Sequence, residues 1–270
     1  MSGRRIAAIA LSVFRESVRD RVFYNLLLFA ILLVGASVLV GQMTAGQDVK
    51  IIKDLGLAAT SLFGLFIAVF VGINLVWKEL ERRSVYSLLA KPVRRTELVV
   101  GKYAGLALTL LVNVVVMAVV LYGVLAWMWW SSPPQLRAAW EAPATDPALL
   151  LAFLLIYVQL LLVTAIALFF STFSSPMLSA ALTFGLYVIG HFNADLKHFE
   201  SVVESAPVVW LTRALYYLLP NLAPFNVTAQ VVHGQAVAPG FVAMTIGYAA
   251  VYVAFLLAAG AHIFARRDFK

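Results

Sequence analysis

The chain has 270 residues, of which 63% are hydrophobic and 12% are charged, and its mean hydropathy is +0.93. Soluble domains carry roughly 25% charged residues, so this composition predicts a membrane protein. The formal net charge of +7 does not indicate nucleic-acid binding, because the charges gather at the ends of apolar runs. The absence of cysteine excludes disulfides, thiolate metal sites and cysteine nucleophiles.

Residues 4–22 form an amphipathic stretch ahead of the first long apolar run. Apolar side chains such as Ile6, Ile9 and Val13 recur at helical spacing, and charged side chains lie on the opposite side. We expect a helix in the inner membrane interface, with arginines on anionic lipid headgroups. The alternative is a tail that only sets the topology. The arginines assigned to the headgroups are Arg5, Arg15, Arg19 and Arg21.

A helix needs about 20 apolar residues to cross a bilayer core. Six segments are candidates, and none shows the alternation typical of strands: residues 24–43, 55–77, 103–127, 149–170, 177–193 and 240–264. The sequence therefore predicts an all-α integral membrane protein with six transmembrane helices and a single domain over residues 1–270. The second span carries a stripe of small residues that permits close helix approach, namely Gly56, Gly64, Ala68 and Gly72.

Lysine and arginine are unevenly divided between the two sides of these spans. One side holds 15 of them, in the N-terminal stretch, in residues 78–102 and at the C-terminus, and the other side holds five. Lys50, Lys53 and Arg137 are among the five, in the expected outer loops. Positive charge favours the cytoplasmic side, so both termini and residues 78–102 are expected in the cytoplasm.

The charged block of residues 77–102 lies between two long apolar runs and contains seven Lys or Arg and three Glu. Such a block must lie in water at the membrane face. We interpret it as a docking surface for a soluble partner, and the alternative is a solvated loop that only sets the topology.

The outer segment of residues 194–239 contains a run of apolar residues too short to span, interrupted by Arg213 and ended by Pro220 and Pro224. This pattern favours a re-entrant or interfacial element.

Within the spans, neutral polar residues offer either hydrogen bonds between helices, worth roughly 0.6–2 kcal/mol, or contacts to a substrate path. These residues are Asn74, Asn113 and Gln159.

Two classes of activity are disfavoured. No lysine precedes serine or threonine and no two glycines are adjacent, so the chain does not carry its own phosphate-binding loop. The middles of the predicted spans contain no Asp, Glu, Lys or Arg, which argues against an ion-coupled transporter or an intramembrane protease.

Four features together resemble the permease subunit of a bacterial ABC-2-type transporter. They are FRESVRDRVFYN before the first span, KELERRSVYSLLAKPVRRTELVVGKYAGL between the second and third spans, the six-span layout with both ends inside, and YYLLPNLAPFN before the last span. The resemblance covers essentially the whole chain, and it is nearest to the branch that includes permeases of nitrous-oxide reductase maturation and gliding motility.

The resemblance implies an arrangement of subunits and segments. Two permease copies, identical or paralogous, pair in the bacterial inner membrane, and two separate ATPase subunits bind below them with the ATP and Mg²⁺. No cofactor is expected in this chain. Residues 1–23 would form the elbow helix, 24–77 spans one and two, 78–102 the cytoplasmic coupling segment, 103–193 spans three to five, 194–239 the external re-entrant segment, and 240–270 the last span and tail.

Residues 79–92 would form a coupling helix seated in a groove of the ATPase. An apolar anchor with a charged rim is normal interface anatomy. The anchor would be Leu80, Tyr86, Leu88 and Leu89, and the rim would be Glu79, Glu81, Arg82 and Arg83. Pro92 would end the helix. Arg94, Arg95 and Lys102 would contact lipid headgroups or the partner.

By the same resemblance, spans one, two and five line a central path, with Thr183, Phe184 and Tyr187 as candidate lining residues. The function expected is a permease, an exporter, driven by a separate ATPase. Two alternatives stay open: a membrane anchor that recruits a cytoplasmic complex without transport, and a secondary transporter. The sequence does not reveal the substrate.

Overall fold

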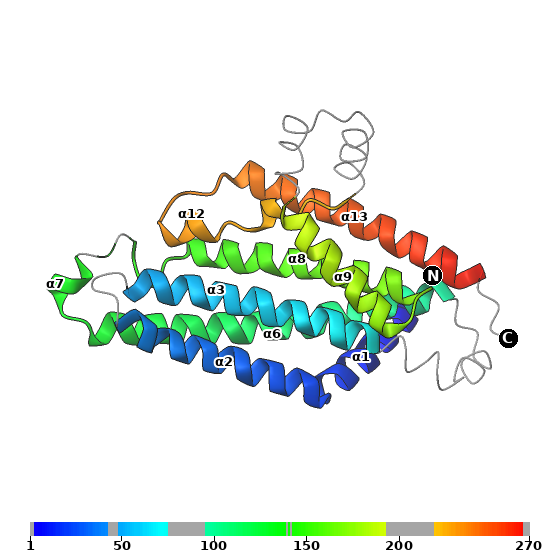
Figure 1. Cartoon of the computed structure of the whole chain (residues 1–270), viewed down its shortest axis with the longest axis horizontal. Coiled ribbons are helices and arrows are strands. Elements are labelled where there is room, and N and C mark those ends of the chain that lie inside the picture. The colour runs from blue at the N-terminus through cyan, green and yellow to red at the C-terminus, as the bar shows by residue number, and fades with distance from the viewer. Residues whose placement is uncertain are drawn as a thin grey trace.

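The computed structural model describes residues 3–42, 48–74, 95–138, 140, 142–192 and 219–266. Within these ranges the regular elements are all helices and none is a strand, which confirms the all-α prediction. Most helices run side by side along the long axis of an elongated bundle (Figure 1). The N-terminal helix and the end of the C-terminal helix lie at one end, and the short α7, Pro134–Arg137, lies at the other.

Five helices of the described part are long and apolar enough to cross a membrane. They are α2 (Arg21–Gln42), α3 (Asp48–Phe66, continued by the π-helical turn η1, Ile67–Val71), α6 (Arg95–Ser131), α8 (Ala148–Ser171) and α13 (Pro239–Arg266). The predicted fifth span corresponds to α9 (Pro176–His191), an apolar helix of 16 residues. At ~1.5 Å rise per residue, α9 is shorter than a bilayer core of about 30 Å.

Two helices begin earlier than hydropathy predicts, and each holds a buried, paired charged residue near its start. α3 begins at Asp48 instead of residue 55, and its Lys53 is fully buried, with Nζ donating to the Pro143 carbonyl oxygen at 2.7 Å. Lys50 and Lys53 therefore lie on the helix of the second span, and the prediction that they lie outside it is wrong. α6 begins at Arg95 instead of residue 103, and its buried Glu97 lies 4.0 Å from Arg5.

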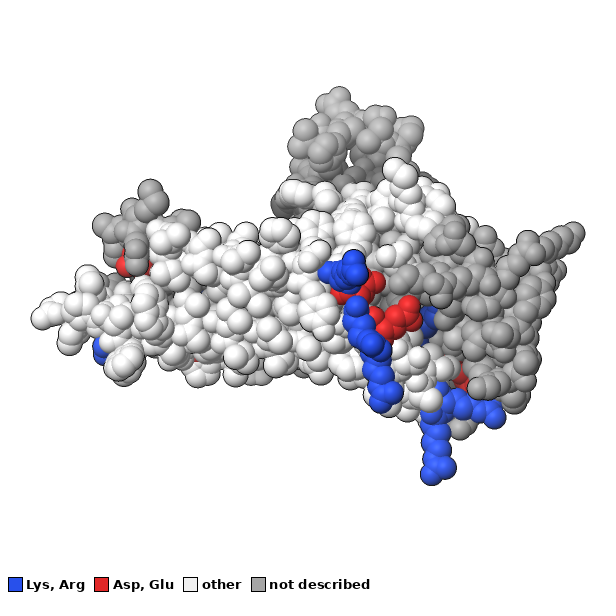
Figure 2. Space-filling view, turned by 90° about the horizontal axis from the view of Figure 1, so that it is seen from below, with Lys and Arg blue, Asp and Glu red and all other residues white. Residues whose placement is uncertain are grey.

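The N-terminal stretch folds as a separate helix, α1 (Gly3–Val18), which ends before Arg19. The Asp20 carboxylate accepts a hydrogen bond from the Val22 amide and so caps the start of α2. One side of α1 packs on α6 through its buried residues Ala10, Val13 and Ser17. Figure 2 shows the described Lys and Arg side chains gathered mainly at the end that holds α1, beside a long surface of uncharged residues.

The small residues of α3 permit the close helix contacts that the sequence predicts. A Cβ atom on Gly56 would lie 2.5 Å from Leu121 of α6, and one on Gly64 would lie 2.4 Å from Leu160 of α8. α3 also packs against α2 and against the short α12 (Thr228–Val232), so it occupies the middle of the bundle. A functional residue on α3 is therefore held from several sides.

Candidate functional site

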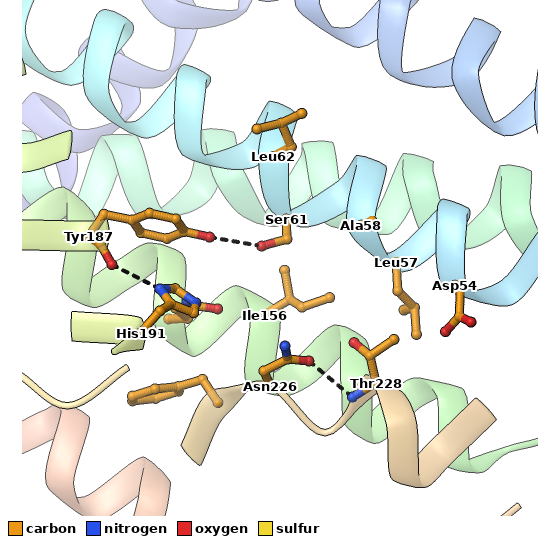
Figure 3. A pocket seen from close by; sticks show the side chains of 12 residues that line it. Asp54, Leu57, Ala58, Ser61, Leu62, Ile156, Tyr187, His191, Asn226 and Thr228 are labelled. Carbon is orange, nitrogen blue, oxygen red and sulfur yellow. Dashed lines mark hydrogen bonds between the residues drawn. The ribbon is translucent and has the colours of Figure 1, made fainter. Parts of the chain in front are cut away.

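A cavity of about 450 Å³ opens between α3, α8, α9 and the segment that precedes α12 (Figure 3). Its wall mixes apolar and polar side chains within an otherwise apolar bundle. The polar members are Asp54, Ser61, Gln159, Tyr187, His191, Asn226 and Thr228. Polar groups at membrane depth are costly unless they are paired or bind a ligand, so this concentration marks the cavity as the candidate site.

A hydrogen-bonded chain joins α8 to α9 at the cavity. His191 Nδ1 lies 2.8 Å from the Tyr187 carbonyl oxygen, and His191 Nε2 lies 3.0 Å from Gln159 Nε2. A carbonyl oxygen only accepts, so Nδ1 carries the proton. Nε2 then accepts from the Gln159 amide, and the arrangement fits a neutral imidazole in one tautomer.

A second contact joins α9 to α3. The Tyr187 and Ser61 hydroxyl oxygens lie 3.4 Å apart, and the Tyr187 ring packs at a tilted angle against the His191 ring with centroids 4.4 Å apart (Figure 3). Next to this contact, the Phe184 ring packs against Phe66 and Phe70 with centroid distances of 5.8 and 5.9 Å. The cavity side of α9 is thus fixed by two polar contacts and an aromatic cluster.

Phe225 and Asn226 line the cavity from the segment of residues 219–226, which contains the short 3-10 helix η2 (Ala223–Phe225). The Leu222 amide donates to the Gly190 carbonyl oxygen at 2.9 Å, and the Asn221 amide donates to the Tyr248 hydroxyl at 2.8 Å. These bonds attach the segment to α9 and to α13. A Cβ on Gly190 would lie 2.7 Å from the Pro220 carbonyl oxygen, so only glycine allows this approach.

The chemistry available at the cavity is hydrogen bonding and binding of a polar group. Asp54 supplies a partly exposed carboxylate, and the Asn226 amide oxygen already accepts from the Thr228 backbone at 3.2 Å. No group of three or more His, Asp or Glu that can hold a metal ion occurs among the described residues.

The structure brings two of the predicted path residues, Gln159 and Tyr187, to the cavity wall. Thr183 is buried and donates its hydroxyl to the Ser179 carbonyl oxygen, and Phe184 belongs to the aromatic cluster. Asn74 is exposed at the end of the described part of the second span. None of the described residues of α2, the predicted first span, lines this cavity.

Asn113 lies in the middle of α6 and is fully buried. Neither its amide nitrogen nor its carbonyl oxygen has a hydrogen-bond partner among the described residues. Asn113 does not line the cavity, whereas Gln159 does, so the two predicted polar residues have different surroundings.

Ser61, His191 and Asn226 line the cavity but were not predicted from the sequence. His191 had a usable signal, because it follows Tyr187 by one helical turn and therefore lies on the same side of α9. No sequence signal marked Asn226, since it belongs to an irregular segment whose position depends on tertiary contacts.

Of the predicted elbow arginines, Arg5 lies 4.0 Å from Glu97, and Arg15, Arg19 and Arg21 are exposed. Lys102 is buried in α6, and Arg95 is the first residue of that helix. The other predicted coupling residues lie outside the described part of the chain: Glu79, Leu80, Glu81, Arg82, Arg83, Tyr86, Leu88, Leu89, Pro92 and Arg94.

Comparison with known proteins agrees with this architecture. The family model described as ABC-2 family transporter protein matches residues 7–269, which extends from α1 to beyond the end of α13. A comparison with curated proteins gives no match. Because the family match spans nearly the whole chain, the protein belongs to the ABC-2 family of transporter proteins.

Proposed function

We propose that this chain is the membrane-spanning permease subunit of an exporter and that separate ATPase subunits hydrolyse the ATP. The family match over residues 7–269 carries the proposal. The polar cavity in an apolar bundle supports it, since a transported molecule that carries a polar group needs a polar surface within the membrane. The uneven distribution of Lys and Arg favours a bacterial inner-membrane orientation with both termini in the cytoplasm.

The ATPase would dock on residues 79–92, which lead into α6. Two contacts at the start of α6 support this position. Arg5 lies 4.0 Å from Glu97, and Gly101 and Gly105 lie close against Ile9, Ala10 and Val13 of α1. A force on the segment before α6 would therefore move α1 and α6 as one unit, and α6 contacts α3 through Leu121 and Gly56.

The cavity would form half of the substrate path. Asp54 and His191 in its wall are partly exposed on a single chain, whereas Gln159 is buried. Exposure of such groups to lipid is costly. A second permease copy, identical or paralogous, would cover them and complete the path, and ATP binding would change how the two copies pack.

Co-purification with an ATPase encoded beside this gene, where the genome holds one, tests the proposal. The permease is expected to co-elute with the ATPase and to change its hydrolysis rate. The double variant Leu88→Asp, Leu89→Asp is expected to lose both effects, because charge would enter the apolar anchor. Leu136→Asp, at an exposed residue of α7, is the matched control and should keep both. Independent migration of the two wild-type proteins would refute the proposal and favour a scaffold without an ATPase.

A further inference from the structure

A second cavity is lined by Leu219 and Pro220, which begin the segment that contributes Phe225 and Asn226 to the wall of the polar cavity. It has a volume of about 500 Å³ and lies between α8, α9 and α13. Its lining is apolar and aromatic, and includes Ile166, Phe170, Leu186, Tyr252 and Phe255. Its volume is within the range of roughly 300–1,000 Å³ that is usual for ligand sites. We call it the apolar groove.

Two side chains that line the apolar groove from α13 are exposed at its rim: Val251 is 71% exposed and Phe255 is 68% exposed. α8 and α13 are both long and apolar enough to cross a membrane. The medium that meets the rim is therefore lipid hydrocarbon.

The lining of the groove extends over residues 166–170 of α8 and 251–256 of α13. At ~1.5 Å rise per residue these stretches are about 6 and 8 Å long, which is about half the ~15 Å depth of one leaflet of a ~30 Å bilayer core. Phe169 and Phe170 lie at the end of the groove next to Ser171, the last residue of α8. The groove is therefore long enough for a segment of one hydrocarbon chain.

Water is a poor occupant of this groove, and so is a void. Water needs two to four polar partners, and the lining offers the Tyr252 hydroxyl, whose ring is packed 5.2 Å from Tyr248. A void would leave the lining atoms without dispersion contacts. A hydrocarbon chain makes dispersion contacts with the lining, and its binding removes no polar group from water.

We propose that the apolar groove binds one acyl chain of a membrane phospholipid, from the leaflet on the side of the α8–α9 turn. The bound chain packs on Leu219 and Pro220, which begin the segment whose Phe225 and Asn226 line the polar cavity. The acyl chain thereby supports that cavity wall from behind. This inference goes beyond the proposed function and does not depend on the ATPase.

Photocrosslinking in the full chain tests the proposal. The protein is reconstituted with phosphatidylethanolamine that carries a diazirine on a palmitoyl chain, illuminated, and digested for peptide mass spectrometry. Crosslinks are expected to concentrate in residues 166–170 and 251–256. Leu186→Trp, which fills the groove, should remove these crosslinks, whereas Met244→Trp, at a 79% exposed residue outside the groove, should leave them. Leu186→Phe serves the same purpose if the tryptophan variant does not fold.

Two results would overturn the proposal. Crosslinks spread equally over exposed residues such as Leu28 and Leu32 of α2 would mean a general lipid surface. The natural chain has no cysteine, so Phe255→Cys introduces a single thiol. A disulfide-linked dimer of that variant, without lipid crosslinks at residues 251–256, would show that a second copy covers the groove.

Discussion

Gly105 of α6 lies so close to Ala10 of α1 that a Cβ on the glycine would be 2.7 Å from the Ala10 carbonyl oxygen. One turn earlier, a Cβ on Gly101 would lie 2.8 Å from Ile9 Cβ. Two glycines four residues apart allow two helix backbones to approach closely. α1 is therefore packed into the bundle on one side, while Arg15 remains exposed on another.

Gly105→Ala is expected to destabilise the protein by about 1–3 kcal/mol, because the added methyl group meets backbone that cannot rotate away. The same change should loosen α1 and increase tryptic cleavage at Arg15. Thermal unfolding in detergent and limited proteolysis measure the two effects.

Gly123→Ala is the matched control on the same helix. A Cβ at Gly123 meets no described atom within 4 Å. Alanine also favours the helix by roughly 1 kcal/mol over glycine, so this variant should be neutral or more stable. Equal stability of the two variants would contradict the close packing of α1 on α6.

Gly190→Ala is expected to displace the wall of the polar cavity. The added methyl group would lie 2.7 Å from the Pro220 carbonyl oxygen and would strain the bond from the Leu222 amide to the Gly190 carbonyl. The expected loss of stability is about 1–3 kcal/mol. Gly185→Ala on the same helix, where no described atom lies within 4 Å of the new Cβ, should show no loss. Comparing the two unfolding temperatures checks the prediction.

The long helices were predictable, because a run of about 20 apolar residues has few alternatives in a membrane protein. The stripe of Gly56 and Gly64 was predictable for the same type of reason, since small residues on one side of a helix permit a neighbour to approach. Both features depend on local sequence. The exact count of six spans stays a prediction, because α9 is only 16 residues long.

The features that the sequence did not predict depend on partners far along the chain. Lys53 is tolerated inside a helix because Pro143, 90 residues later, supplies an acceptor. Glu97 is tolerated in α6 beside Arg5 of α1. The pairing of Gln159 with His191 requires that α8 and α9 meet at the correct depth, and this depth follows from the short turn after Ser171.

Asn113→Leu is expected to leave the stability unchanged or to raise it by about 1–2 kcal/mol. Both polar atoms of the buried Asn113 side chain lack partners among the described residues, and a buried unpaired amide is costly. Leucine has a similar size and no polar group. A higher unfolding temperature together with loss of transport would show that Asn113 is needed for transport and not for stability. A lower unfolding temperature would contradict the prediction that the buried amide of Asn113 is a net cost to stability.

Gln159→Leu is expected to lower stability by about 1–3 kcal/mol, because it leaves His191 Nε2 without the donor that lies 3.0 Å away. His191→Phe alone should have a similar cost, since it leaves the Gln159 amide unpaired and also removes the bond to the Tyr187 carbonyl oxygen. The double variant replaces both partners with apolar groups, so its loss should be smaller than the sum of the two single losses. A double-mutant cycle of thermal unfolding measures this coupling. Additive losses would show that Gln159 and His191 do not interact, and the cavity would then lose the contact that fixes α9 against α8.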